Sequence, residues 1–284
     1  MGLFRALETV RRPAAARLFA DPLAAPLLRG SLRAVAVAAR LPGVGACVAA
    51  LIDRRWPGAR SSAVARTRLI DDAVTAALAS GVEQVVILGA GFDGRAYRLP
   101  GIERTRVFEV DHPTTSAAKR ARLTALLGAL PSHVRFVGLD FDRQPLLAAL
   151  DAAGCDRTRR SAIIWEGVTN YLTADAVDAT LRDVATFAQG SVLLFTYVHR
   201  GILDGSVRFA GAERLGATLR RAGEPWTFGL DPAALPSYLA ARRLTLVEDL
   251  GACDYRARYL GDPGRGYAFY RAVVARVGGA PCPR

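Results

Sequence analysis

From Val85 onward the sequence alternates short apolar runs with helix-length stretches, and this alternation restricts the possible folds more than any other feature. The first five runs are "VVILG", "TRVFEV", "VRFVGL", "SAIIWE" and "SVLLFTYV", and "RLTLVEDL" and "YAFYRAVVARV" follow near the end. None shows the clean polar–apolar alternation of a half-exposed strand. They therefore predict an α/β fold: a doubly wound, mostly parallel, seven-stranded, Rossmann-like sheet with helices on both faces.

The chain before these runs has a different pattern and predicts helices. The stretch "SSAVARTRLIDDAVTAALASG" combines serines that are able to cap a helix, apolar residues at helical spacing and a closing Gly81. We expect residues 1–80 to form an N-terminal helical cover or lid and residues 81–284 to form the main domain. The less regular region near 200–240 is expected to be a substrate-cap insertion.

Charge and composition exclude several classes of function. The formal net charge of +12 would favour binding to a nucleic acid. However, the arginines are spread along the whole chain without an aromatic–basic cluster, so we expect no nucleic-acid partner. Cysteines and histidines are scattered, which predicts no metal site. The most apolar early run is broken by Arg40 and Pro42, so we expect a cytoplasmic protein without a membrane anchor.

The stretch "VVILGAGFDGRAYRLP" carries a glycine-rich turn directly after the first apolar run. Gly89, Gly91 and Gly94 match the dinucleotide-binding spacing G-x-G-x-x-G, which is weak evidence by itself. In a dinucleotide site the third glycine opens a long helix that faces the diphosphate. Here Pro100 and Gly101 interrupt the chain six residues later, so only one or two helical turns fit.

Acidic residues follow several of the predicted strands, where ligands of such sheets bind. Glu109 and Asp111 lie about 20 residues after the first glycine, where a carboxylate is able to accept hydrogen bonds from both hydroxyls of a ribose. Glu109 could instead pair with Arg95 or Arg98. Asp140 is placed to accept a hydrogen bond from the exocyclic amine of an adenine, and Phe141 is placed to cover the adenine ring. These groups favour a nucleoside ligand without a diphosphate.

Four segments in order resemble the leucine carboxyl methyltransferase-like family of class I S-adenosylmethionine-dependent methyltransferases. They are "VARTRLIDD", "VVILGAGFDGRAYRL", "VFEVDHP" and "WEGVTNYLT", and the resemblance extends from about Leu18 to Val274. The most similar branch contains bacterial natural-product O-methyltransferases. The resemblance implies S-adenosyl-L-methionine as the cofactor. The family usually has Thr or Ser where this chain has Gly94, so the third glycine of the dinucleotide-like pattern is incidental.

The resemblance also implies roles for individual residues. Arg66 corresponds to an arginine that reaches the cofactor carboxylate, with Arg68 as an alternative donor. Glu166 corresponds to the residue that faces the methionine amino group, and Asp93 either contacts the cofactor or fixes the glycine loop by local hydrogen bonds. The full set of expected cofactor-binding residues is Arg66, Gly89, Ala90, Gly91, Asp93, Glu109, Asp111, Asp140, Phe141 and Glu166.

Residues after the fifth strand are candidates for the acceptor side of the reaction. His199 is the one histidine placed to remove a proton from a phenol or alcohol, and Tyr197 could orient the acceptor. Arg200 and Arg256 could hold an acidic substrate, and Trp226 could line its pocket. A carboxylate acceptor needs no base. We therefore predict O-methylation of a carboxyl or phenolic oxygen of a small-molecule substrate in secondary metabolism.

Three alternatives remain at this stage. A protein C-terminal carboxyl methyltransferase would share the fold and cofactor but act on a polypeptide. A nicotinamide-dependent oxidoreductase would use the same glycine loop for NAD. A non-catalytic binding module would use the fold or the positive charge without chemistry.

Overall fold

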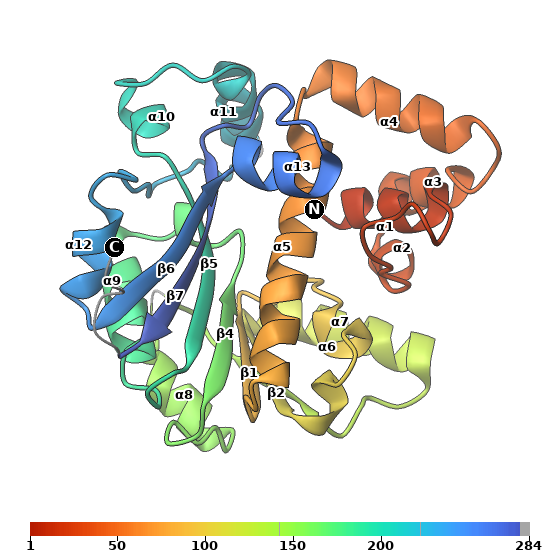
Figure 1. The fold of residues 1–284 in the computed structure, drawn as a ribbon. Helices are drawn as coiled ribbons and strands as arrows, with labels where there is room; N and C mark the ends of the chain where they lie inside the picture. Colours follow the sequence, from red (N-terminus) through yellow and green to blue (C-terminus); the bar gives the residue numbers. More distant parts are fainter. Residues whose placement is uncertain (142, 222, 279–284) are drawn as a thin grey trace.

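The computed structural model describes residues 1–141, 143–221 and 223–278, and it contains a seven-stranded sheet (Figure 1). The spatial order of the strands is β3-β2-β1-β4-β5-β7-β6. Their bounds are β1 Gln84–Leu88, β2 Arg106–Asp111, β3 Val134–Gly138, β4 Ser161–Trp165, β5 Val192–Val198, β6 Leu244–Gly251 and β7 Tyr270–Val277. All seven predicted strands are therefore confirmed.

Strand direction follows from the connections between the strands. Helical crossovers connect the consecutive strands from β1 through β5, and these five strands are parallel. β7 runs antiparallel to both β5 and β6. β1 and β4 lie side by side in the centre, and every residue of both strands is buried. Burial on both faces explains why these runs lack polar alternation in the sequence.

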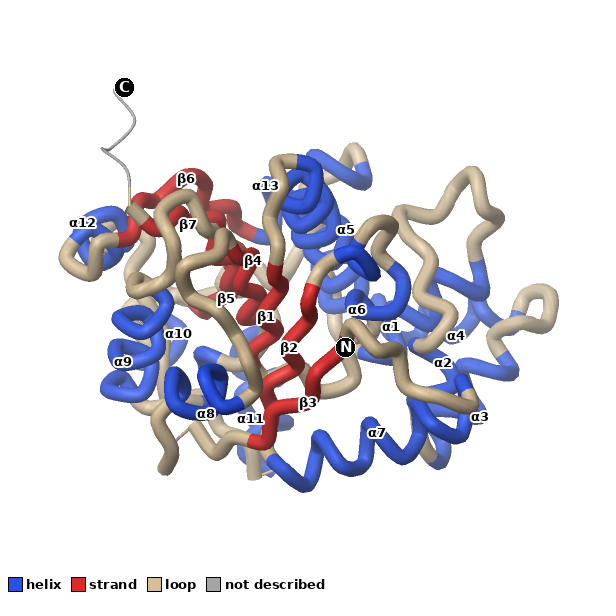
Figure 2. Tube along the Cα trace, turned by 90° about the horizontal axis from the view of Figure 1, so that it is seen from below, coloured by secondary structure: helices blue, strands red, loops and turns tan. Residues whose placement is uncertain are grey.

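Helices cover both faces of the sheet, as Figure 2 shows from below. One face packs against α8 Leu146–Ala152, α9 Ala174–Val184 and α12 Leu235–Ala240, around a core that contains Trp165 and Phe195. The other face carries α5 Ala59–Ala79 and α6 Arg95–Arg98, around Ile87 and Ile164. α7 Pro113–Leu127 contacts the edge strand β3 and its neighbour β2. The doubly wound α/β class is confirmed.

The N-terminal region is helical, as expected for residues 1–80. It contains α1 Gly2–Arg11, α2 Ala24–Leu27, α3 Gly30–Ala38, α4 Val44–Arg55 and α5. α5 begins at Ala59 after Gly58, which has a left-handed φ of 82°, so the serine caps expected at the start of "SSAVART" lie inside the helix. Ser62 instead contacts the Tyr255 hydroxyl at 2.7 Å. The helix ends at Ala79, two residues before Gly81.

The region near 200–240 begins above the carboxyl ends of the parallel strands, at the upper edge in Figure 1, and ends in α12 beside β6. It holds α10 Gly201–Asp204, α11 Ala212–Arg221 and α12. Nearby, α13 Ala252–Leu260 packs against α5. Within the described ranges, no helix combines the length and the apolar character needed to cross a membrane.

Candidate cofactor-binding site

The loop after β1 approaches its neighbours too closely for side chains. Gly89 has a φ of 64°, and a Cβ there would lie 2.3 Å from a methyl carbon of Val168. Gly91 also has a positive φ, of 44°. α6 starts at Arg95 and has four residues, so the helix after the loop is as short as the sequence predicts. The loop thus exposes backbone groups without a long helix to face a diphosphate.

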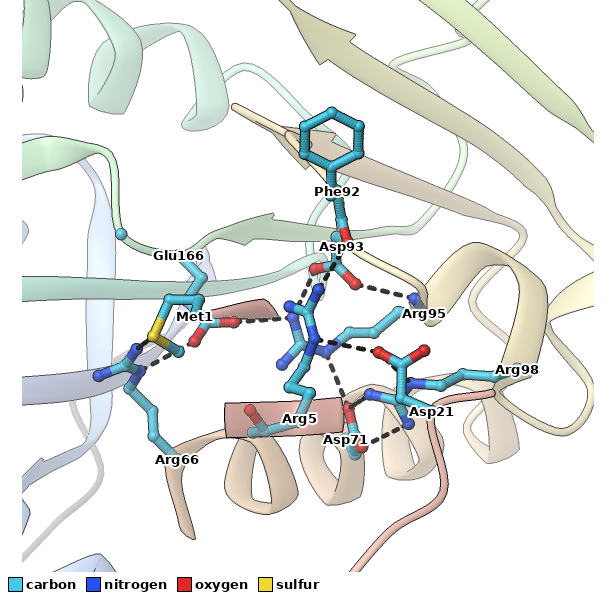
Figure 3. Close-up of polar contacts among 12 residues, drawn as sticks. Met1, Arg5, Asp21, Arg66, Asp71, Phe92, Asp93, Arg95, Arg98 and Glu166 are labelled. Atoms are coloured by element: carbon cyan, nitrogen blue, oxygen red, sulfur yellow. Dashed lines mark hydrogen bonds and ion pairs between the residues drawn. The ribbon is translucent and has the colours of Figure 1, made fainter. Parts of the chain in front are cut away.

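A cavity of about 240 Å³ lies at the carboxyl ends of β1 and β4, between the glycine loop and the start of α1. Its lining includes Gly89 to Asp93 from the loop, Glu166 and Gly167 after β4, and Met1, Gly2 and Arg5 from the N-terminal region. Figure 3 shows several of these side chains. The N-terminal helical region therefore contributes to this cavity.

A chain of buried ion pairs lies beside the cavity (Figure 3). Glu166 accepts hydrogen bonds from Arg66 Nε at 2.9 Å and from Arg95 Nη1 at 2.8 Å. Arg95 also contacts Asp93 at 2.6 Å and Asp71 at 2.8 Å. We call the following set the ion-pair chain: Arg5, Asp21, Arg66, Asp71, Asp93, Arg95, Arg98 and Glu166.

These pairings keep buried carboxyl groups ionised. Burial alone would favour the neutral acid, but Arg95 and Arg66 lower the pKa of Glu166 to about 2. Asp93 also has a pKa well below its usual range. Burial disfavours its ionised form, but nearby cations, Arg95 first among them, lower the pKa. One Asp93 oxygen accepts from the Arg95 backbone at 2.8 Å. Asp93 therefore fixes the glycine loop, which is one of its two expected roles.

Arg66 and Arg68 differ sharply in their surroundings. Arg66 is buried, stacks over the Tyr270 ring at 4.2 Å and bonds to Glu166. Arg68 pairs instead with Asp72 at 2.7 Å on the outside of α5. The structure thus places Arg66, and not Arg68, beside the cavity.

No sequence pattern predicts the part that Asp21 plays. Its carboxylate pairs with Arg5 at 3.0 Å, and Arg5 also donates to the Phe92 carbonyl of the glycine loop. A Cβ at Gly94 would lie 2.6 Å from an Asp21 oxygen. The glycine that departs from the family pattern therefore provides space for Asp21.

The acids expected at the nucleoside end lie at the ends of neighbouring strands. Asp111 accepts from the His112 backbone at 2.7 Å and from the Gly91 backbone. Each carboxylate oxygen keeps a second lone pair, which remains available for a ribose hydroxyl. Asp140 is half-buried after β3 and lies 3.6 Å from Arg143, and Phe141 packs on the core. Asp142 precedes Gln144 and Pro145, a pattern that predicts a helix cap, but it lies outside the described residues.

Glu109 has a different partner from those expected. It is buried within β2 and accepts from Lys119 of α7 at 2.8 Å, instead of pairing with Arg95 or Arg98. Lys119 also donates to the Asp93 carbonyl at 2.8 Å. Because the Glu109 side chain is buried inside the fold and paired with Lys119, this placement gives it a structural role and does not support ribose binding. Burial raises the pKa of Glu109 to about 7, although Lys119 opposes this.

This raised pKa predicts a dependence of stability on pH. Between about pH 4.5 and pH 7 the unfolded chain releases the Glu109 proton while the folded chain keeps it. The free energy of unfolding contributed by this group therefore falls as pH rises through that interval. Glu109→Gln removes this contribution, so the stability difference between variant and wild type should shift in favour of the variant on going from pH 4.5 to 7. Urea unfolding at both pH values measures this, and a constant difference would contradict it.

The two residues expected to act in catalysis are both engaged in local structure. Tyr197 is buried and donates to Asp249 at 2.9 Å. It lies on the face of β5 opposite Thr196, whose hydroxyl accepts from Gly167 beside the cavity. This position does not support an orienting role for Tyr197. His199 Nδ1 accepts from the Gly201 backbone at 3.0 Å, and its ring packs 5.2 Å from the Phe209 ring.

The three residues expected to bind substrate lie apart from one another. Arg256 is fully buried and donates to the Arg265 carbonyl at 3.2 Å, so it holds a loop and has no open face for a substrate. Arg200 is exposed and lines a surface hollow near α12. Trp226 lines a cavity beneath α11 and packs against Phe269 and Tyr270. Of the three, Trp226 has the position expected of a pocket residue.

The site fits the cofactor that the sequence implies. The glycine loop leaves space that a Cβ would fill, and the adjoining cavity is lined by Glu166, which pairs with the buried Arg66. Arg66 and Glu166 would hold the methionine part, Gly89 to Gly91 the middle, and Asp111, Asp140 and Phe141 the nucleoside. Among the described residues, no group of three potential metal ligands gathers at one place.

Known proteins with related sequences agree with this assignment. The chain is 45% identical over 150 residues to a protein of Mycolicibacterium gilvum, over 52% of this chain and 47% of that protein. A Frankia alni protein is 37% identical over 216 residues, which cover 75% and 71% of the two chains. Both carry the name "Putative S-adenosyl-L-methionine-dependent methyltransferase". The chain thus spans about half the length of the first relative.

Solved structures and a family model complete the comparison. A "putative methyltransferase" from Thermobifida fusca superposes with a TM-score of 0.60 at 21% identity, over 84% of this chain and 89% of that one. At this identity the likeness shows the fold alone. The model of the leucine carboxyl methyltransferase family matches residues 1–185. The chain therefore belongs to the leucine carboxyl methyltransferase family, as its four sequence motifs predict.

Proposed function

We propose that this chain methylates a carboxylate oxygen of a small molecule. The methyltransferase class and S-adenosylmethionine as cofactor come with the family. The acceptor is the new element of the proposal. It is supported by one observation: the three candidate bases nearest the cofactor site, Glu166, His199 and Asp111, are already engaged in ion pairs or hydrogen bonds.

The engaged groups are two carboxylates and one imidazole. Glu166 is held by two arginines, and its lowered pKa makes it a poor proton acceptor. His199 accepts a hydrogen bond at Nδ1, so its neutral ring carries the proton at Nε2 and acts there as a donor. Asp111 accepts hydrogen bonds from two backbone N–H groups, and the proposal assigns its remaining lone pairs to the ribose hydroxyls of the cofactor. A phenol or alcohol would need one of these groups to take its proton, whereas a carboxylate needs none.

The chemistry then depends mainly on alignment. When bound, S-adenosylmethionine supplies an electrophilic methyl group on a sulfonium. Arg66 and Glu166 are fixed by the ion-pair chain, and Tyr270 closes one side against the Arg66 guanidinium at 4.2 Å. Rigid placement of this kind is able to supply up to roughly 7–11 kcal/mol of rate enhancement without acid–base catalysis.

A matched panel of acceptors tests the proposal. Purified chain is incubated with S-adenosylmethionine labelled on the methyl group and with aromatic acids, the phenols of the same ring systems, and peptides with a free C-terminal carboxylate. We expect base-labile methyl esters from the small acids, at a rate that does not change between pH 6 and 9. Transfer to phenols alone, with a rate that rises with pH, would overturn the proposal. Transfer to peptides alone would assign the rival activity on protein C-termini.

His199 should contribute little to transfer onto a carboxylate. His199→Ala is expected to change the turnover number for an acid acceptor by less than about threefold, because no proton is removed. His199→Asn is the matched variant, since its side-chain oxygen is able to accept from Gly201 as Nδ1 does. A loss of a hundredfold or more in both variants would identify His199 as a base. A loss in His199→Ala alone would trace the effect to the local hydrogen bond.

A further inference from the structure

Two cavities outside the cofactor site meet at the cap. The first, about 580 Å³, lies between the α4–α5 corner and the start of α11, and the second, about 470 Å³, lies beneath α11. Arg208, Phe209 and Glu213 line both, so the two are neighbouring chambers. We call the first the arginine chamber and the second the apolar chamber.

The arginine chamber carries positive charge that the described residues leave unbalanced. Its lining contains Arg55, Arg208 and Arg214, against a single acid, Glu213. Arg214 donates to the Arg55 carbonyl at 3.3 Å, which brings the segment before α5 and the cap together. In contrast to the arginines of the ion-pair chain, these three form no ion pair within the described ranges. Their guanidinium groups are therefore available to an anion.

The apolar chamber offers a more apolar surface. Ile202, Leu203, Val207, Leu219 and Trp226 contribute to its lining, together with the charged residues Arg208, Glu213 and Arg220. α11 covers it, and although Ala212 and Leu215 pack against the cluster around Phe269, no residue of α11 is buried. The two chambers together match a molecule with an apolar body and an anionic group.

A row of packed aromatic rings lies between the chambers and the cofactor site. Phe209 packs on Phe269 at 5.8 Å, Phe269 on Trp226 at 5.7 Å, and Trp226 on Tyr270 at 6.5 Å between ring centroids. Tyr270 in turn lies under Arg66. Tyr267, which lines the arginine chamber, has a φ of 60°, a strained conformation for a residue other than glycine. Such strain is commonly kept at ligand sites.

We propose that these two chambers form the acceptor site and that they select an amphipathic anion. The apolar body occupies the space beneath α11, and the arginine chamber holds an anionic group separate from the oxygen that is methylated. This inference rests on the proposed function for the identity of the ligand as acceptor, but the binding site itself is testable without any turnover.

Two fluorescent probes that differ by one anionic group provide the test. They are 8-anilinonaphthalene-1-sulfonate and N-phenyl-1-naphthylamine, which lacks the sulfonate. We expect the wild-type chain to bind the sulfonate at least tenfold more tightly than the neutral probe. Arg208→Gln combined with Arg214→Gln should weaken sulfonate binding about tenfold, which corresponds to about 1.4 kcal/mol, and should leave the neutral probe within twofold.

The matched control removes the same charge elsewhere. Arg40 and Arg54 are exposed, lie outside both linings and form no ion pair within the described ranges. Arg40→Gln combined with Arg54→Gln should leave both probes unaffected. Equal losses in the two double variants would reduce the effect to non-specific attraction by the net charge and overturn the proposal. Equal affinity of the wild type for both probes would also overturn it.

Phe209 and the cofactor provide the remaining readouts. Phe209→Ala should weaken both probes, because its ring lines both chambers, with far-UV circular dichroism as the check on folding. Calorimetric titration of the arginine variants with S-adenosylhomocysteine should match wild type. If the wild type fails to bind S-adenosylhomocysteine, the proposed function fails, whereas the two probes still decide whether this site exists.

Discussion

Replacing Arg95 with methionine is expected to lower the free energy of unfolding by about 3–5 kcal/mol, the cost of removing one partner from a buried ion pair. Arg95 is fully buried and contacts Asp71, Asp93 and Glu166 within 2.8 Å. Methionine fills much of the same space but leaves three carboxylates without their shared cation. Urea unfolding at pH 7 measures the loss.

A surface arginine serves as the control for this prediction. Arg159 also pairs with two acids, Glu83 at 2.7 Å and Asp156 at 3.3 Å, but its side chain is 53% exposed. Arg159→Met should cost at most about 1 kcal/mol, because water solvates the charges that remain. Equal costs at the two positions would show that burial of the network is unimportant. If Arg95→Met yields no folded protein, Arg95→Lys retains the charge and should show a smaller loss.

Replacing Asp111 with alanine should weaken binding of S-adenosylhomocysteine about a hundredfold while the fold persists. Hydrogen bonds to a charged group contribute about 1.5–3 kcal/mol each, and two ribose hydroxyls would lose their acceptor. The variant also releases the Gly91 backbone, which Asp111 holds in the glycine loop. Calorimetric titration gives the dissociation constant.

The control for Asp111 is an acid of the same charge on the surface. Glu103, on a short helix before β2, is exposed, and Glu103→Ala should bind the cofactor product as wild type does. Unchanged affinity in Asp111→Ala would refute the assignment of the nucleoside end. Circular dichroism separates loss of binding from loss of structure.

Local pattern was sufficient to predict the strands and the glycine loop. Each strand is a short apolar run whose burial on both faces removes polar alternation, and Pro100 with Gly101 limits the helix after the loop. Arg66 and Glu166 could be assigned to one site because motifs before and after the loop resemble a family. These signals lie within a few residues of the positions that they predict.

Pairings between distant segments could not be predicted in this way. Glu109 has several cationic neighbours in sequence, and only the packing of α7 against β2 selects Lys119. The space that Gly94 provides for Asp21 depends on the approach of the N-terminal region. The hydrogen bond of Tyr197 could not be predicted for the same reason, because its partner Asp249 lies 52 residues later in the chain, in β6.

The ion-pair chain has a consequence for how the molecule denatures. Its arginines and carboxylates come from α1, the segment before α2, α5, the glycine loop, α6 and the end of β4. Separation of the N-terminal helices from the sheet would therefore expose charges to solvent without their partners. The cover and the sheet should therefore melt as one cooperative unit, and a ligand that tightens the cavity between them should raise the melting temperature of both together.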